Sequence, residues 1–218
     1  MQAAPKPPFV RWFQRRLLAW YRRNGRKLPW RRTRDPYRIL VSEIMLQQTQ
    51  VERVKGYYRR FLHQYPTFED LAAAAEPAVR ESWDGLGYYA RARNLHATAR
   101  IVVGEHGGRL PADPSTIRRL PGIGRYTAGA VLSIAYGQDE PILDTNAARV
   151  LSRVFAVRSR RGRSAQRRRL WELAEHLVPP NAAGDFNQAI MDLGATICRA
   201  RNPQCPCCPL RSKCRTRA

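Results

Sequence analysis

The sequence of 218 residues predicts an all-α fold. Apolar residues recur at helical spacing along most of the chain, and glycine and proline turns separate the segments that carry them. The alternation of apolar and polar residues that marks a strand is not found. The length suffices for a sizeable core in one domain or in two small ones.

Near the N-terminus, residues 9–24 have the amphipathic pattern of a helix and end in an Asn-Gly pair. A basic segment interrupted by proline follows, and it contains Trp30 and Arg31. An aromatic ring beside a cation suits stacking on a nucleic-acid base. Packing of Trp30 in the core is the alternative.

Residues 37–50 predict a helix that is apolar nearly all round and contains a single acid, Glu43. A carboxyl group in such surroundings loses hydration, which favours its protonated form and suits a general acid. The alternative is a glutamate on a narrow exposed stripe. Two further helices are expected over residues 52–62 and 68–82.

A glycine turn at residues 85–89 leads into a basic helix that is expected to run to about residue 103. The turn carries Tyr88 and Tyr89. Either ring can wedge into a base stack, or it can anchor the turn in the core.

Residues 120–146 are the stretch around which the chain is organised. Their first turn contains Gly122 and Gly124, which permit left-handed backbone and close approach to another molecule. Helical patterns flank the turn, so the segment predicts a hairpin of two helices whose backbone N–H groups suit a phosphate. An ordinary structural hairpin is the alternative. Asp144 then stands at the N-cap of a helix expected to reach about residue 157.

An arginine cluster follows at residues 158–169 and is expected to form an exposed loop that contacts phosphate or is merely solvated. Two more helices are expected over residues 170–178 and 186–198.

The composition points to a polyanionic partner. The formal net charge is +22, and 35 of the 39 basic residues are arginine, which binds phosphate bidentately. Because these arginines lie within helical segments, the positive charge belongs to a folded surface. Nucleic acid is therefore favoured over association with a membrane or ribosome. We expect a cytoplasmic, nucleoid-associated protein, because the sequence has no apolar run of membrane-spanning length and its first residues lack a signal-peptide core.

Four cysteines near the C-terminus follow the spacing C-x6-C-x2-C-x5-C, and Cys207 is a spare. Such a group in a cytosolic chain indicates a metal site. The spacing alone leaves zinc and an iron–sulfur cluster open, and from the residues alone we prefer zinc. The four spaced residues are Cys198, Cys205, Cys208 and Cys214.

The hairpin LPGIGRYTAG, the downstream Asp144 and the cysteine spacing together resemble the helix-hairpin-helix DNA glycosylase superfamily with its [4Fe–4S] cluster. The segments SEIMLQQTQV, GLGYYARARNLH, PILDTNAARVL and FNQAIMDLGATIC resemble its MutY-type adenine DNA glycosylases. The resemblance extends from about Leu28 to Cys214. It implies one [4Fe–4S] cluster on the four spaced cysteines in place of zinc.

The resemblance also implies two helical lobes. A six-helix barrel would cover residues 29–137, with the helix-hairpin-helix near 114–137. An iron–sulfur cluster lobe would combine residues 1–28 and 138–218. The partner would be double-stranded DNA with a mismatch or an oxidised base, bound by a monomer that flips the target nucleotide out of the duplex.

By the same resemblance, Glu43 would protonate adenine N7, and Asp144 would stabilise the cationic sugar while water attacks C1′. Asn146 would orient Asp144 or the water. The remaining residues would contact DNA, with Gln47, Gln48 and Thr49 near the partner base, Tyr88 in the stack, Trp30 and Arg31 beside the extruded adenine, and Gly122 and Gly124 at a phosphate.

Tyr126 stands where bifunctional relatives such as endonuclease III carry the lysine that forms a Schiff base, so we expect a monofunctional enzyme. It would remove adenine mispaired with guanine or 8-oxoguanine. Typical MutY proteins continue into a C-terminal domain that recognises 8-oxoguanine, whereas this sequence stops at Ala218, so strong discrimination for that base is not expected. The alternatives are a mismatch-specific thymine or uracil DNA glycosylase and a non-catalytic DNA-binding protein.

Overall fold

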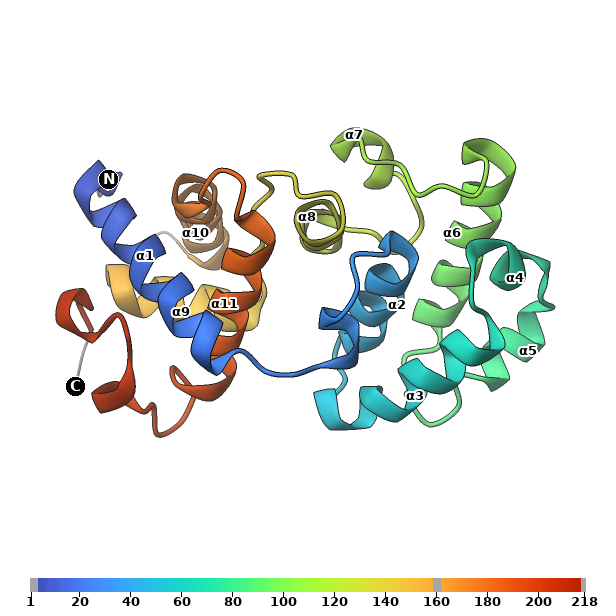
Figure 1. Cartoon of the computed structure of the whole chain (residues 1–218), viewed down its shortest axis with the longest axis horizontal. Helices are drawn as coiled ribbons and strands as arrows, with labels where there is room; N and C mark the ends of the chain where they lie inside the picture. Colours follow the sequence, from blue (N-terminus) through green and yellow to red (C-terminus); the bar gives the residue numbers. More distant parts are fainter. Residues whose placement is uncertain (1–3, 159–161, 217–218) are drawn as a thin grey trace. The chain divides into compact units, whose positions relative to one another are not determined.

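The computed structural model describes residues 4–158 and 162–216, and this part of the chain is helical without a strand. It divides into two compact units (Figure 1). The first unit joins Met1–Arg26 to Gly137–Ala218, and the second is Lys27–Tyr136. No helix in the described ranges combines the length and apolar character needed to cross a membrane.

The first unit is built from both ends of the chain. The N-terminal helix α1 packs against α11 and α10, and α11 packs against α9 (Figure 1). Its core includes the rings of Phe13, Phe155 and Phe186, and the centroid of the Phe13 ring lies 6.1 Å from that of Phe155 and 6.0 Å from that of Phe186. The helices are α1 (Pro7–Asn24), α9 (Thr145–Phe155), α10 (Arg163–Leu177) and α11 (Ala183–Thr196), with short turns η2 (Cys205–Cys207) and η3 (Arg211–Lys213).

The second unit surrounds α2, whose apolar residues are buried on nearly every side. Helix α2 begins at Pro36 because the Asp35 carboxylate caps it by accepting the Arg38 N–H. It packs against α3, α6 and α8. The elements are η1 (Pro29–Arg31), α2 (Pro36–Leu46), α3 (Val51–Gln64), α4 (Phe68–Ala73), α5 (Glu76–Glu81), α6 (Ala90–His106), α7 (Pro114–Ile117) and α8 (Arg125–Ile134).

Two expected helices differ from those observed. The helix expected over residues 37–50 ends at Leu46, because Gln47 has extended backbone and Gln48 a left-handed backbone with φ 56°. The helix expected over residues 68–82 is two helices, α4 and α5, separated by extended backbone at Ala74 and Ala75. Pro77 explains the break, because it has no N–H to continue the hydrogen bonding of α4.

Candidate functional site

Glu43 lies inside the second unit, with only 5% of its surface exposed. The alternative of a glutamate on an exposed stripe is therefore wrong, because the Glu43 side chain is buried. The hydroxyl of Tyr126, on α8, donates a hydrogen bond to Glu43 Oε2 at 2.8 Å. Packing of α2 against α8 thus places a phenol directly against the candidate acid.

Two loops in this unit hold the residues expected near the DNA stack. Gln48 and Tyr88 both have left-handed backbones, with φ 56° and 51°. Such a conformation is uncommon for residues other than glycine and often occurs at functional sites. Tyr88 is 58% exposed, so the structure rules out the core anchor; the Arg91 guanidinium group lies over the ring, and the exposed part of Tyr88 can contact another molecule. Gln47 contacts Thr127 at 3.4 Å, and Thr49 lies in the same loop.

Arg91, which the sequence reasoning missed, joins these two loops. Its guanidinium group is buried and donates hydrogen bonds to backbone carbonyls on both sides and to the Thr49 hydroxyl at 3.0 Å. Arg91 also lies over the Trp83 ring. The carbonyl acceptors are those of Ile44 and Met45 at the end of α2, of Gln47 in the first loop, and of Leu86, Gly87 and Tyr88 in the second loop.

The sequence does carry a signal for Arg91. It shares one helical face with Leu95, Thr98 and Val102, all of them buried. An arginine on an apolar face needs several hydrogen-bond acceptors, and loop carbonyls supply them here.

Trp30 packs in the core of the second unit, 5% exposed, with its ring edge-on to Tyr58 at 5.4 Å. The structure thus confirms the alternative that Trp30 packs in the core. The half-buried Arg31 follows it in η1. Contact of either residue with an extruded base stays a prediction.

The hairpin of α7 and α8 has the turn that the sequence predicts, with one correction. Gly122 is left-handed at φ 75°, and a Cβ there would lie 2.9 Å from Asn94 Cβ. Gly124 instead has extended backbone at the N-cap of α8, where a Cβ would meet nothing within 4 Å. Only Gly122 therefore needs glycine for its conformation, and the open space beside Gly124 suits an approaching ligand.

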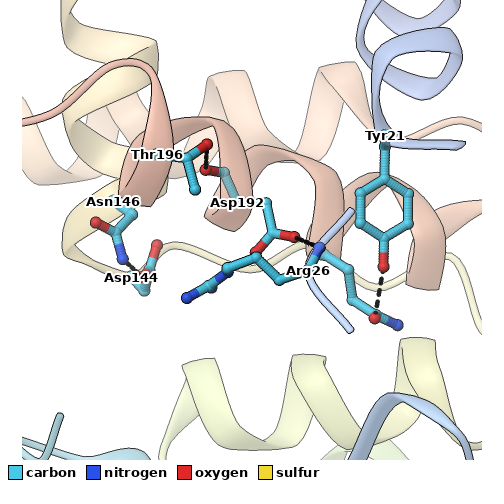
Figure 2. A network of polar contacts seen from close by, with 7 residues as sticks. Tyr21, Arg26, Asp144, Asn146, Asp192 and Thr196 are labelled. Carbon is cyan, nitrogen blue, oxygen red and sulfur yellow. Dashed lines mark hydrogen bonds and ion pairs between the residues drawn. The ribbon is translucent and has the colours of Figure 1, made fainter. Parts of the chain in front are cut away.

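Asp144 caps α9 in the first unit, as predicted. Its Oδ1 accepts the Ala147 N–H at 2.6 Å. Asn146 Nδ2 donates to its Oδ2 at 2.9 Å, as Figure 2 shows. The Asp144 side chain thus satisfies a backbone N–H that has no partner within the helix. The expected pair of Asp144 and Asn146 is therefore brought together, while Glu43 belongs to the other unit.

Arg149 connects this pair to the cysteine segment, a second link that the sequence reasoning missed. Its Nη2 donates to Asn146 Oδ1 at 2.6 Å and to the Gly194 carbonyl at 2.8 Å. Its Nε donates to the Cys198 carbonyl at 2.8 Å. One turn later, Arg153 Nη1 lies 3.4 Å from Cys198 Sγ.

All four spaced cysteines line one cavity of about 150 Å³ in the first unit, together with apolar residues of α9 and α11. Burial raises the pKa of the Cys208 thiol to about 11, so a thiolate there needs a compensating cation. In residues 4–158 and 162–216, no three His, Cys, Asp or Glu side chains gather as a site for a single metal ion. The spare Cys207 is exposed.

The expected arginine loop is partly outside the described residues, since Arg160 and Arg161 are not among them. Arg158 is exposed and lies outside any helix, as expected, whereas the members from Arg163 onward differ from the expectation. Helix α10 already begins at Arg163, so Arg167, Arg168 and Arg169 are helical.

Comparison with known proteins identifies the family of the chain. A model of the HhH-GPD superfamily base excision DNA repair proteins matches residues 41–176. Adenine DNA glycosylase of Homo sapiens is 48% identical over 214 residues, which are 94% of this chain and 39% of that protein. Thymine-DNA glycosylase of Aeropyrum pernix is 42% identical over 205 residues, 92% of each chain. A solved structure of a thermostable thymine-DNA glycosylase has a TM-score of 0.87 and 36% identity, covering 95% of each chain.

The chain spans between 36% and 58% of the length of the adenine DNA glycosylases that it matches. The family match nevertheless covers more than half of the chain and includes both candidate acids. The helical fold and the hairpin agree with it. The chain therefore belongs to the HhH-GPD superfamily of base excision DNA repair proteins and resembles its MutY-type members.

Proposed function

We propose that the chain is a monofunctional DNA glycosylase that removes adenine mispaired with guanine or 8-oxoguanine. The observation that carries the proposal is the buried Glu43, held by the Tyr126 hydroxyl at 2.8 Å. A carboxyl group shielded from water and fixed by a hydrogen bond suits protonation of a leaving base. The identity to adenine DNA glycosylases supports the choice of base.

In the proposed reaction, the target nucleotide leaves the duplex and its base meets Glu43, which donates a proton to adenine N7. The glycosidic bond then breaks and leaves positive charge on the sugar. Asp144, at the N-terminus of α9, would stabilise that charge while a water attacks C1′ and gives up a proton to the Glu43 carboxylate, which restores the acid. Asn146 would hold Asp144 in place through their 2.9 Å hydrogen bond. The meeting of the two acids on one nucleotide is part of the proposal.

The contacts to DNA follow from the loops. The exposed, left-handed Tyr88 would enter the base stack, with Gln47, Gln48 and Thr49 near the partner base. Trp30 and Arg31 would flank the adenine. The N-terminus of α8, capped by Gly124 without a side-chain bond, would seat a phosphate together with Gly122. We propose a monomer that acts on duplex DNA in the cytoplasm, beside the nucleoid.

The residues around the cysteine cavity fit a [4Fe–4S] cluster. Cys198, Cys205, Cys208 and Cys214 would hold it, since four thiolates are its usual ligands. When bound, the cluster supplies iron–thiolate bonds that join α11 to the C-terminal segment. Arg153, near Cys198 Sγ, would offset part of the negative charge of the thiolates.

A second candidate is removal of thymine or uracil from mispairs with guanine. The specific observation in its favour is the thymine-DNA glycosylase of Aeropyrum pernix, which the chain matches over 92% of both lengths. Gln47 and Gln48 favour adenine, because they belong to the segment that resembles MutY-type members.

The test is base release from duplexes that contain A opposite G, A opposite 8-oxoguanine, T opposite G or U opposite G. We expect release of adenine, with loss of at least roughly 100-fold in the Glu43→Gln and Asp144→Asn variants. Faster release of thymine or uracil would support the second candidate. Binding without release from any duplex would indicate a non-catalytic DNA-binding protein and overturn both.

Monofunctional chemistry has a separate test, which is trapping with borohydride. Tyr126 offers a hydroxyl and no amine, and Lys55 of the same unit is paired with Glu52 at 2.8 Å. We expect base release without a covalent protein–DNA adduct. An efficient adduct would show that an amine attacks the sugar.

A further inference from the structure

The outward side of α1 carries a row of three exposed arginines, Arg11, Arg15 and Arg22. Their spacing of four and seven residues places them within about 40° of one another around the helix axis. The buried side chains of α1 lie on the opposite side of the helix and pack into the first unit, and these are Phe13, Leu17 and Trp20. We call the row the α1 arginine face.

Positive charge is concentrated around this face. Residues 1–26 contain seven Lys or Arg and no Asp or Glu. The whole first unit has 22 Lys or Arg against 7 Asp or Glu, a formal charge of +15, whereas the second has 17 against 10, or +7. The net charge of the protein therefore lies mainly outside the unit that holds Glu43 and the hairpin.

The three arginines have no compensating partner within the part of the chain that the structure describes. None of the three forms a hydrogen bond, ion pair or ring contact with another described residue. Arg16 of the same helix, by contrast, donates a hydrogen bond to the Pro209 carbonyl at 3.3 Å. Like charges four residues apart repel each other on a helix. A bound polyanion would turn this repulsion into attraction.

We infer that the α1 arginine face binds the phosphate backbone of duplex DNA outside the lesion site. The row is about 16 Å long, and a duplex presents one charge per about 1.7 Å of its axis, so several phosphates lie within its reach. Guanidinium groups bind phosphate oxygens bidentately. An anionic membrane fits less well, because the apolar side chains of α1 that would enter it are already buried in the first unit.

This inference rests on the proposed function only for the choice of duplex DNA. In the repair of rare lesions, such a face would hold undamaged duplex and keep the enzyme near DNA between encounters. It adds affinity that does not depend on sequence, and it plays no part in breaking the glycosidic bond.

The test is the salt dependence of binding to undamaged duplex for the Arg11→Gln/Arg15→Gln/Arg22→Gln variant. Losing three phosphate contacts should reduce the slope of log affinity against log salt by about 2.7. The matched control is Arg59→Gln/Arg100→Gln/Arg109→Gln, which removes the same charge from exposed positions of the second unit. Its slope should change by less than about one.

Equal slopes for the two triple variants would overturn the inference, because net charge alone would then explain the binding. It would also fail if the α1 variant kept the wild-type slope on DNA but lost binding to phosphatidylserine vesicles or to single-stranded RNA. Circular dichroism checks that α1 still folds. Base release at saturating enzyme on a short mismatched duplex should be unchanged. Absence of release in every variant would refute the proposed function while leaving the slope comparison valid.

Discussion

At the residue scale, the hydroxyl of Tyr126 fixes the direction of the Glu43 carboxyl group. The Tyr126→Phe variant should lower single-turnover base release by roughly 10- to 100-fold, because a hydrogen bond to an ionisable group contributes about 1.5–3 kcal/mol. The Tyr136→Phe variant is the control, since its hydroxyl donates to the Leu110 carbonyl and not to Glu43. A rate that falls equally in both variants would show that Tyr126 acts only through stability.

Arg91 fixes the two loops that carry Gln48 and Tyr88. In the Arg91→Lys variant the charge remains, but an ammonium has three donors and cannot serve the carbonyls of both loops. We expect the free energy of unfolding in urea to fall by about 2–4 kcal/mol. The KM for mismatched duplex should rise more than kcat falls.

The neighbouring Arg93 provides the control, because it is exposed on the same helix. Arg93→Lys should leave both the unfolding free energy and the KM near wild type. If Arg91→Lys also kept the wild-type unfolding free energy and KM, the prediction would be wrong. The two loops would then keep Gln48 and Tyr88 in their left-handed conformations without the guanidinium group.

Individual residues of the candidate site differ in how well the sequence predicts their contacts. The cap at Asp144 was predictable, because an aspartate before an apolar helix has one favoured role, and the structure confirms it. Burial of Glu43 was not, since an apolar segment with one acid fits a buried or an exposed carboxyl until its neighbours are known. Arg91 and Arg149 escaped notice because their partners are carbonyls of distant segments, which no side-chain pattern records.

At the scale of elements, Gly194 sets how closely α11 approaches the start of α9. A Cβ at Gly194 would lie 2.6 Å from Asn146 Cβ and 2.8 Å from its carbonyl oxygen. Backbone cannot move aside as a flexible side chain can. The Gly194→Ala variant should therefore push the two helices apart, cost about 1–3 kcal/mol of unfolding free energy and slow base release by displacing Asn146 from Asp144.

Gly104 of α6 is the matched control, because a Cβ there meets nothing within 4 Å. Gly104→Ala should stabilise the protein by about 0.5–1 kcal/mol and leave base release unchanged. Thermal or urea unfolding of both variants measures the difference. A neutral Gly194→Ala would mean that α9 and α11 can separate without disturbing Asn146.

Helix positions were predictable from periodicity, but some ends were not. The break between α4 and α5 depends on Pro77, whose effect an alanine-rich pattern conceals. The end of α2 at Leu46 depends on Arg91 binding the last carbonyls, a contact from another helix. Periodicity thus located the helices, whereas a single proline and the hydrogen bonds of Arg91 account for two ends that periodicity does not show.

At the scale of the whole molecule, the first unit needs both ends of the chain, because α1 packs against α11 and the cysteine segment follows α11. The four cysteines line the cavity that the proposed cluster would fill. Loss of the cluster should therefore disturb the start of α9, which carries Asp144 and Asn146, as well as the C-terminal segment. A series of hydrogen bonds connects the two regions, from the Cys198 carbonyl through Arg149 to Asn146 and Asp144.

Cys208 and Cys207 are adjacent and make a matched pair for this prediction. Cys208 lines the cavity, whereas Cys207 is exposed and is not among the lining residues. The Cys208→Ser variant should lose the visible absorbance of an iron–sulfur protein, lose at least about 2 kcal/mol of unfolding free energy and release base more slowly. Cys207→Ser should keep all three properties. Full absorbance in Cys208→Ser would remove it from the ligand set, and a Cys207→Ser variant with the same losses would show that the spare thiol binds iron instead.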